Sequence, residues 1–354
     1  MKDVANSNLS LIGSEWFGIP IATLALAEVY ILMFGQTGYS PYNIVGEIFT
    51  FLGISIFLVV LVLWIARAIT YRDGTFSHWN SLTRLSFIAI IPIVGFVSNA
   101  QLIYFFGISS TGAELSLLNY VVDYAIALLL GVLLGFRLYT KKIEPREMNY
   151  AIVIPPLAIG TSIFLGPDLI QYYGGSVARS IYFLTIFGLG IFFMLYIFIG
   201  SLALAGHVAN KNHQTLPTTM LPVGIASLTV INILALVSLN GLHIFYISSS
   251  TAGILSLFLW GFEVWNFLVV GIIILSHPSK GSMSVWAYGF PLGLFSISTL
   301  KIMALTGESD LLWLFGFIAL ALNIIWIYAW YNTVNFLTNK DMMIDRMWQE
   351  KVGE

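Results

Sequence analysis

The sequence predicts an all-α polytopic membrane protein with ten transmembrane helices, and three observations support this fold class. Of the 354 residues, 58% are hydrophobic and only 9% are charged, whereas a water-soluble domain carries about 25% charged residues. The mean hydropathy is +0.89. The apolar residues gather in ten runs, most of them close to the roughly 20 residues with which a helix crosses a bilayer. We therefore expect the lipid bilayer to surround the chain.

Ten predicted spans follow one another along the chain, and the connections between them are too short to hold a separate soluble domain. The spans are residues 16–37, 43–67, 85–106, 116–139, 149–167, 178–206, 217–239, 250–276, 284–305 and 311–338. We interpret them as one transmembrane domain, residues 1–354, built from five consecutive helical hairpins at about 14–68, 85–139, 149–209, 216–276 and 284–338. The polar first residues give no sign of a cleavable signal peptide.

The distribution of positive charge predicts the orientation in the membrane. When the connections are assigned alternately to the two sides, all but two of the 15 Lys and Arg residues fall on the side that holds both termini. The two exceptions are Arg179 and Lys301. Because cytoplasmic loops carry the excess of basic residues, we expect both termini in the cytoplasm of a multi-pass protein of the cell membrane.

Several other functions find no support in the sequence. A net charge of −2 provides no basic face for nucleic acid, and the absence of cysteine excludes thiol chemistry and Cys-ligated metal. Neither an H-E-x-x-H motif nor a P-loop is present. The five histidines lie at span ends or in loops, not as the facing pairs in mid-membrane that would hold a haem. We expect neither enzymatic activity nor a metal or other cofactor.

Prolines divide the spans into two sets, because the odd-numbered spans contain them and the even-numbered spans do not. The prolines within spans are Pro20, Pro92, Pro155, Pro156, Pro222 and Pro291. One proline per odd span recurs at intervals of 64 to 72 residues, so one odd span plus one even span forms a repeat. A proline removes an amide donor and clashes with the preceding turn, which kinks a helix. The expected kinks are at Pro20, Pro92, Pro156, Pro222 and Pro291.

The two sets of spans indicate two environments. Broken helical backbone is tolerated inside a membrane where it is buried in protein or lines a water-filled cavity. We therefore expect the five odd spans to form a quasi-five-fold inner ring around a central pore, each backed by its even partner. Since all odd spans run in the same direction, their kinks would narrow the pore at one depth. The alternative is that the prolines serve only helix packing.

The residues immediately before the repeated prolines are candidates for a hydrophobic girdle in the pore. They are Ile19, Ile91, Pro155, Leu221 and Phe290. None of them is polar, and a hydrophobic constriction gates by dewetting or by direct occlusion. Phe290 is the only bulky aromatic side chain among them. It is therefore the predicted pore gate, unless it is simply a core side chain.

Lys301 follows Phe290 on the same predicted helix. At about 100° per residue, its spacing from Phe290 returns it to the same helical face, roughly 16 Å further towards the outside. A cation at this outer vestibule would concentrate anions. The alternatives are that Lys301 snorkels to the interface or pairs with an acid.

Acidic residues within the spans introduce a second mechanism. The intramembrane acids are Glu28, Asp123 and Glu263, and ionisable groups in spans are functional hypotheses by default. Asp123 and Glu263 are on even spans, which we expect to be outer, and Glu28 faces away from the girdle on a straight helix. We interpret these acids as helix–helix contacts, with Glu28 as the candidate for a proton-linked acid in a coupled transporter.

The segment VWAYGFPLGLFSIST at 285–299 resembles the ninth-helix motif of the tellurite-resistance protein TehA and C4-dicarboxylate transporter family, which also includes plant slow-type anion channels. Further similar strings are SEWFGIPIATLALA at 14–27 and LPTTMLPVGIASL at 216–228. The resemblance implies five helical hairpins around a pore and a homotrimer with one pore in each subunit. It also implies a gate formed by the Phe before the ninth-helix proline, which is Phe290 here.

Members of this family conduct or transport small anions such as chloride, nitrate, sulfite or dicarboxylates, so the resemblance implies an anion pathway closed by Phe290. The alternative is a proton-coupled transporter of a malate-like C4-dicarboxylate, of sulfite or of tellurite, with Glu28 as the coupling acid. A third hypothesis is a sealed helical bundle with a structural or enzymatic role, which would pass no ion.

Overall fold

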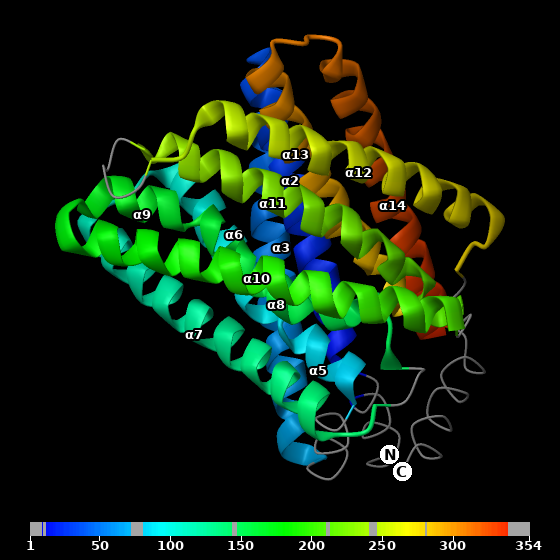
Figure 1. Ribbon diagram of the computed structural model, residues 1–354. Helices are drawn as coiled ribbons and strands as arrows, with labels where there is room; N and C mark the ends of the chain where they lie inside the picture. The colour runs from blue at the N-terminus through cyan, green and yellow to red at the C-terminus, as the bar shows by residue number, and fades with distance from the viewer. Residues whose placement is uncertain are drawn as a thin grey trace.

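The computed structural model describes residues 9, 12–71, 81–143, 147–209, 213–240, 246–279 and 282–338. Among these residues every regular element is a helix, and ten helical segments are long and apolar enough to cross a membrane (Figure 1). Short connections join consecutive segments into one bundle of helices. The predicted all-α polytopic fold is therefore confirmed.

The observed spans match the ten predicted ones, with ends that differ by at most six residues. They are Ser14–Thr37, Ser40–Thr70, Leu82–Phe106, Ser110–Thr140, Tyr150–Tyr173, Gly175–Val208, Thr215–Ser238, Ser249–Ser276, Met283–Thr306 and Leu311–Thr338. The fifth span continues beyond its predicted end as helix α9 (Gly166–Tyr173). Pro167 interrupts the apolar run, but proline fits the first turn of a helix and so begins α9.

The even spans are uninterrupted α-helices. They are α3 (Ser40–Thr70), α7 (Ser110–Thr140), α10 (Gly175–Ala209), α12 (Ser249–Ser276) and α14 (Leu311–Thr338). In the most apolar window of each, only 17% to 39% of the residues are buried within the chain. The exposed side chains are large and apolar, such as Phe198, Phe258 and Ile327. A helix that is apolar on its exposed face suits contact with lipid.

The odd spans are interrupted, and each joins a short helical segment to a longer or second α-helix. The pairs are η1 (Ser14–Phe17) with α2 (Gly18–Thr37), α5 (Leu82–Ile88) with α6 (Ile90–Phe106), η3 (Tyr150–Val153) with α8 (Ile154–Gly160), η5 (His213–Met220) with α11 (Leu221–Ser238), and η7 (Met283–Tyr288) with α13 (Gly289–Thr306). The segments labelled η are 3₁₀ helices, and the fifth span has a second one, η4 (Thr161–Phe164), before α9.

The repeated prolines stand at these interruptions. Each lies within the first three residues of the α-helix that follows the short segment, as Pro20 does in α2 and Pro291 in α13. The first turn is where a helix tolerates a residue without an amide donor. The predicted kink is therefore a change of helix just before the proline, not a bend within one continuous α-helix.

Burial separates the two sets of spans. In the odd spans 61% to 83% of the residues in the most apolar window are buried, which is well above the range of the even spans. The odd spans are therefore the interior helices, and the even spans cover them. The distribution of prolines in the sequence predicted this division.

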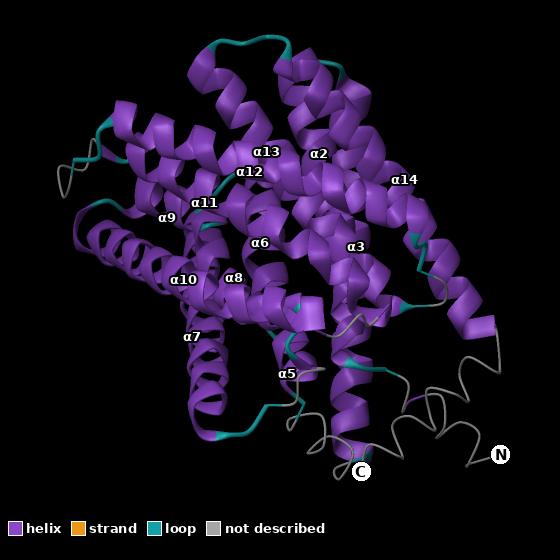
Figure 2. Ribbon diagram, turned by 45° about the vertical axis from the view of Figure 1, so that its right-hand side comes forward, coloured by secondary structure: helices purple, strands orange, loops and turns teal. Residues whose placement is uncertain are grey.

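The interior helices contact one another in a closed series. Helix α2 packs against α6, α6 against α8, α8 against α11, α11 against α13, and α13 against α2. Each even helix lies against two of them; α12 contacts α11 and α13, and α14 contacts α13 and α2. Figure 2 shows these helices from a second direction, with α13 and α2 side by side.

Small residues allow α13 to approach α2 closely. A Cβ atom on Gly289 would lie 2.4 Å from Cβ of Ala22, and one on Gly293 would lie 2.7 Å from Cβ of Ala25. These distances are shorter than any real contact between carbon atoms, so larger residues do not fit here. The pair Gly289 and Gly293 forms the small-xxx-small surface that membrane helices use for close contact.

Candidate functional site

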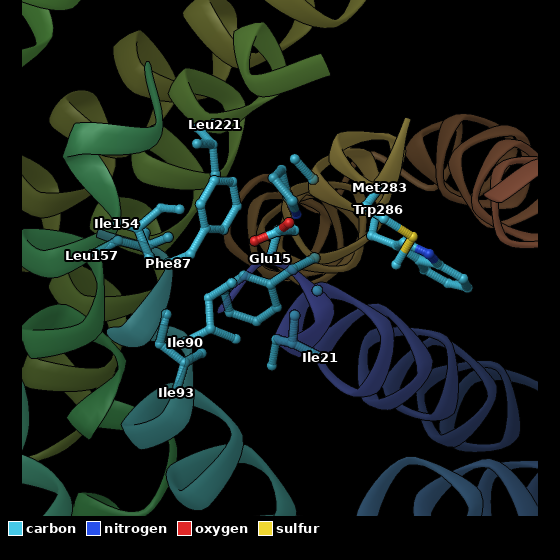
Figure 3. Close-up of a pocket in the computed structure, with 14 residues that line it drawn as sticks. Glu15, Ile21, Phe87, Ile90, Ile93, Ile154, Leu157, Leu221, Met283 and Trp286 are labelled. Atoms are coloured by element: carbon cyan, nitrogen blue, oxygen red, sulfur yellow. The ribbon is translucent and has the colours of Figure 1, made fainter. Parts of the chain in front are cut away.

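A cavity lies where the interrupted segments of the odd spans meet. All five odd spans contribute to its lining, which consists of Glu15, Gly18, Ile21, Phe87, Ile90, Ile93, Ile154, Leu157, Leu221, Met283, Trp286, Ala287, Phe290 and Pro291. Figure 3 shows these side chains converging from several helices on one space. The interior helices thus line a cavity at the level of their repeated prolines.

The cavity is small and its lining is mostly apolar. Its volume is about 30 Å³, which is room for about two water molecules at roughly 10–15 Å³ each. Among the described residues that line it, Glu15 is the only ionisable one. A space of this size is too small for a hydrated ion.

The lining follows the repeated prolines in a regular register. In the first, third and fifth spans it includes the residue two before and the residue one after the proline. These are Gly18 and Ile21, Ile90 and Ile93, and Ile154 and Leu157. Residues three apart share one face of a helix. In the seventh and ninth spans the lining instead includes the residue immediately before the proline, which is Leu221 or Phe290.

The structure therefore brings two residues of the predicted girdle, Leu221 and Phe290, to one cavity. Ile19, Ile91 and Pro155 each adjoin a lining residue but are not among the described residues that line the cavity. The prediction assumed that a fixed distance from the proline gives a fixed direction. In the structure the offset that faces the cavity differs between the first three odd spans and the last two.

Phe290 and Trp286 form the aromatic part of the lining contributed by the ninth span. Trp286 is fixed from the outer layer, because its Nε1 donates a hydrogen bond of 2.9 Å to Thr333 Oγ1 of α14 and its ring meets Trp330 edge to face. Phe290 is only 7% exposed, and its side chain has no hydrogen-bonding group. A rotation of Phe290 would therefore break no hydrogen bond.

Glu15 is a lining residue that the sequence analysis missed. It belongs to η1, and Figure 3 shows its carboxylate among the apolar side chains of the cavity. An acid at the start of a span is easily assigned to the polar segment that precedes a transmembrane helix. Its position in the repeat would have identified it. Glu15 lies five residues before the repeated proline of its span, and the lining residues Phe87 and Trp286 lie five residues before the repeated prolines of theirs.

Lys301, predicted at the outer vestibule, lies near an acid on a neighbouring interior helix. Lys301 of α13 and Glu28 of α2 are both partly buried, and their charges interact. Gln101 of α6 donates a 3.1 Å hydrogen bond from Nε2 to Glu28 Oε2. Gln101 is itself oriented by the backbone oxygen of Leu24 at 2.9 Å and by Thr50 Oγ1 at 3.0 Å. Three interior helices thus meet at a polar cluster roughly 10–16 Å along the helix axes from the cavity.

Two further acids lie on outer helices and face inward. Glu263 of α12 is fully buried, and its Oε2 accepts hydrogen bonds from Ser227 of α11 and Ser298 of α13. Asp123 of α7 packs against α6, where a Cβ atom on Gly95 would lie 1.9 Å from Asp123 Oδ2. The predicted position of both acids at helix–helix contacts is confirmed.

The acids and the lysine considered above lie at three kinds of place in the described part of the chain. Glu15 is at the cavity, Glu28 and Lys301 are together further along the interior helices, and Asp123 and Glu263 are at contacts with the outer layer. Within the part of the chain that the structure describes, no group of three or more His, Asp or Glu side chains is arranged to hold a metal ion.

Comparisons with known proteins place this architecture in a family. The uncharacterized transporter MJ0762 of Methanocaldococcus jannaschii is 24% identical over 352 residues, which cover 94% of this chain and 97% of that protein. The uncharacterized transporter MJ0576 of the same organism is 23% identical over 310 residues, which cover 84% of this chain and 86% of that protein. The family model described as SLAC1, voltage-dependent anion channel, matches residues 12–334 and so reaches every span. The resemblance noted in the sequence is confirmed, and the chain belongs to the SLAC1 family of voltage-dependent anion channels.

Proposed function

We propose that the chain conducts small anions across the membrane along a path enclosed by the five odd spans, and that Phe290 closes this path. The observation that carries the proposal is the apolar cavity to which all five odd spans contribute and which Phe290 lines. Membership of a family described as voltage-dependent anion channels supports anions as the transported class. A ring of five hairpins is part of the proposal, and the closed series of contacts among the interior helices supports it.

The apolar lining opposes ion passage in two ways. An anion that enters the cavity loses water, and the lining offers few polar groups to replace that water. The Phe290 ring also fills space that an ion would need. Leu221, Ile21, Ile90 and Leu157 share the cavity with Phe290, so together they form the hydrophobic girdle of this proposal.

Charged groups at the two ends of the path act in opposite senses. Lys301 attracts anions to the outer vestibule, although Glu28 beside it weakens that field. At the cavity, a negative charge on Glu15 repels anions. Anion preference then depends on Lys301 and on the ease with which a weakly hydrated anion gives up its water.

A proton-coupled transporter of organic anions is the second candidate, and the charge interaction between Glu28 and Lys301 favours it. A proton on Glu28 would remove the negative charge that competes with a bound anion for Lys301. Lys301 could then attract an oxyanion such as a malate-like C4-dicarboxylate, sulfite or tellurite. Uptake that saturates with substrate and collapses without a pH gradient would distinguish this transporter from a passive channel.

The assembly and orientation belong to the same proposal. The resemblance suggests a homotrimer with one path in each subunit, in the cell membrane with both termini in the cytoplasm. The apolar outer faces of the even helices suit contact with lipid or with a second subunit. Cross-linking of the protein in its native membrane tests the trimer, since a monomeric band alone would contradict it.

The experiment that tests the proposed function is ion flux through the purified protein in planar bilayers with a chloride gradient. A current that reverses near the chloride equilibrium potential is expected, small for the wild type and larger when the Phe290 ring is removed. A current that reverses near the cation potential would contradict anion selectivity. The absence of any flux of chloride, nitrate or dicarboxylate would favour a sealed bundle.

A further inference from the structure

Glu263 lies at the junction of the helix that carries Phe290 and a neighbouring interior helix. It belongs to the outer helix α12 and is 0% exposed. Its Oε2 is 2.8 Å from Ser227 Oγ of α11 and also accepts a short hydrogen bond from Ser298 Oγ of α13. One carboxyl oxygen from the outer layer therefore joins two helices that line the cavity.

This junction is the centre of a polar strip along one face of α12. Trp260 Nε1 donates a 3.2 Å hydrogen bond to Thr299 Oγ1 of α13, and Asn266 Nδ2 donates one of 3.2 Å to the backbone oxygen of Thr219. Trp260, Glu263 and Asn266 are three residues apart and so share a helical face. Polar contacts therefore join α12 to the interior helices along this strip.

The two serines have too few hydrogens for all the acceptors around them. Ser227 Oγ also lies 2.8 Å from the backbone oxygen of Val223, and Ser298 Oγ lies 3.0 Å from that of Phe295. A hydroxyl has one hydrogen to donate, so each serine serves either Glu263 or its own helix. The other carboxyl oxygen of Glu263, Oε1, is buried without a hydrogen-bond partner among the residues that the structure describes.

Two hydrogen-bond arrangements fit these positions, and they differ by one proton. With the carboxyl ionised, both serines donate to Glu263 and leave their backbone acceptors. With the carboxyl protonated, Glu263 donates to one serine, and the serine hydroxyls can donate to their own helices. In the first arrangement two hydrogen bonds to a charged carboxylate connect α11 and α13 to α12, and in the second arrangement this connection is weaker.

A change in these hydrogen bonds would also affect the packing around Phe290. A Cβ atom on Gly224 of α11 would lie 3.0 Å from Cβ of Pro291, so α11 and α13 are in tight contact next to Phe290. On the other flank, Gly289 and Ala22 hold α13 equally close to α2. Closely packed helices move as units and do not deform continuously, so a shift of α13 at Ser298 is transmitted along the helix.

We propose that Glu263 is a proton-binding site that positions α13, so that uptake or release of a proton changes how readily the path opens at Phe290. This inference rests on the proposed function, because it takes Phe290 as the gate. Glu263 touches neither the cavity nor a transported ion and therefore acts through the helix that it holds.

Few other charges face this site in the described part of the chain. Helix α11 has no ionisable residue, α12 has only Glu263, and α13 has only Lys301, which interacts with Glu28 of α2. Helix α12 also contacts η5, whose His213 has a side chain outside the described residues, and α14. Helix α14 contributes tyrosines but no acid or base. In the described part of the chain, the carboxyl groups that act on α13 are therefore Glu263 at Ser298 and Glu28 near Lys301, and Glu263→Gln separates their effects.

The test measures chloride flux into proteoliposomes as a function of pH for the wild type, Glu263→Gln and Asp123→Asn. Asp123 is the matched control, because it is also a buried acid on an outer helix but packs against Gly95 of α6. We expect wild-type flux to change by about fivefold or more with pH, the lower end of ordinary coupling between sites. Glu263→Gln should remove this dependence, and Asp123→Asn should retain it.

A second readout reports the proton directly. Infrared difference spectra between acidic and alkaline pH should contain a carboxyl C=O band that Glu263→Gln removes and Asp123→Asn does not. Ser298→Ala keeps the carboxyl but frees α13, so it should retain the band and lose the pH dependence of flux. Gel filtration shows whether each variant is folded.

The two readouts separate failure of this inference from failure of the proposed function. A Glu263→Gln protein with the wild-type pH profile and an unchanged infrared band would overturn the inference, as would wild-type flux that does not vary with pH. If neither the wild type nor Phe290→Ala passes anions, the proposed function fails. The gating role of Glu263 then falls with it, and the infrared band alone decides whether the site exchanges a proton.

Discussion

Replacing Phe290 with Ala removes a six-membered ring from the apolar lining of the cavity. The ring borders a cavity of only about 30 Å³ where the five odd spans meet. Its six carbons occupy roughly the room of three water molecules at about 30 Å³ each. The space that the substitution creates is therefore comparable with the existing cavity, which has room for about two water molecules, and it adjoins that cavity directly.

Two magnitudes follow from this geometry. A buried Phe→Ala change costs about 3–5 kcal/mol of unfolding free energy, and we expect the lower end because one side of the Phe290 ring already faces the cavity. Ion flux responds to the barrier, and each 1.4 kcal/mol or so removed from a barrier raises a rate about tenfold. Since the ring both occludes and dries the path, we expect chloride current to rise by at least about tenfold.

Planar-bilayer currents in asymmetric chloride measure this effect, and Phe295→Ala provides the matched control. Phe295 is on the same helix, is fully buried and packs against Phe267 of α12 with ring centroids 5.4 Å apart. It is not among the described residues that line the cavity. Phe295→Ala should lose comparable stability and gain no current. A folded Phe290→Ala protein with unchanged current, or an equal gain in both variants, would refute the assignment of the gate.

Three further changes test separate parts of the site. Gly289→Ala should lower the melting temperature, because its Cβ would lie 2.4 Å from Cβ of Ala22, at an overpacking cost of about 1–3 kcal/mol. Gly261→Ala on α12 is the control, because no described atom lies within 4 Å of the added Cβ, and it should leave the melting temperature unchanged. Equal melting temperatures for the Gly289→Ala and Gly261→Ala proteins would contradict the close contact of α2 and α13. Lys301→Gln should reduce chloride flux, most strongly at low ionic strength where its charge is least screened; unchanged flux would limit Lys301 to local pairing. Glu15→Gln should increase chloride flux, since it removes negative charge from the lining; a decrease would show that this carboxylate does not oppose anions.

The positions of the ten spans could be predicted from sequence because they depend on local properties. The thickness of the bilayer sets the length of each apolar run, and polar residues at its ends have little influence on whether a helix forms. They do influence where it begins. The fourth span starts at Ser110, earlier than predicted, because the Ser109 side chain accepts a 3.1 Å hydrogen bond from the Gly112 amide and caps the helix.

The division into interior and outer helices was also predictable, since proline acts on its own helix. The form of the interruption was not. Six residues of η7 before Gly289 have no sequence feature that distinguishes a 3₁₀ helix from an α-helix. Phe290 and Leu221 reached the cavity at the predicted offset, and Ile19 did not.

Contacts between helices could not be predicted, because helices that are apolar on all sides give no periodic signal of their rotation. Glu28 and Lys301 are far apart in sequence, and only the packing of α2 against α13 brings them together. The same holds for Glu263, whose partners are two serines on different helices. Glu15 was missed for a related reason, because its direction depends on how η1 joins α2.

The central claim is that anions pass between the interior helices, and introduced cysteines test it most directly because the chain contains no cysteine of its own. Leu157 of α8 lines the cavity, and Leu204 of α10 is exposed on the outer layer. Each is replaced by Cys in the Phe290→Ala protein, and a charged thiol reagent is added while current is recorded. We predict that the reagent blocks current through the Leu157→Cys protein and leaves the Leu204→Cys protein unaffected. Persistent current through modified Leu157→Cys, or block of Leu204→Cys, would contradict a path enclosed by the odd spans.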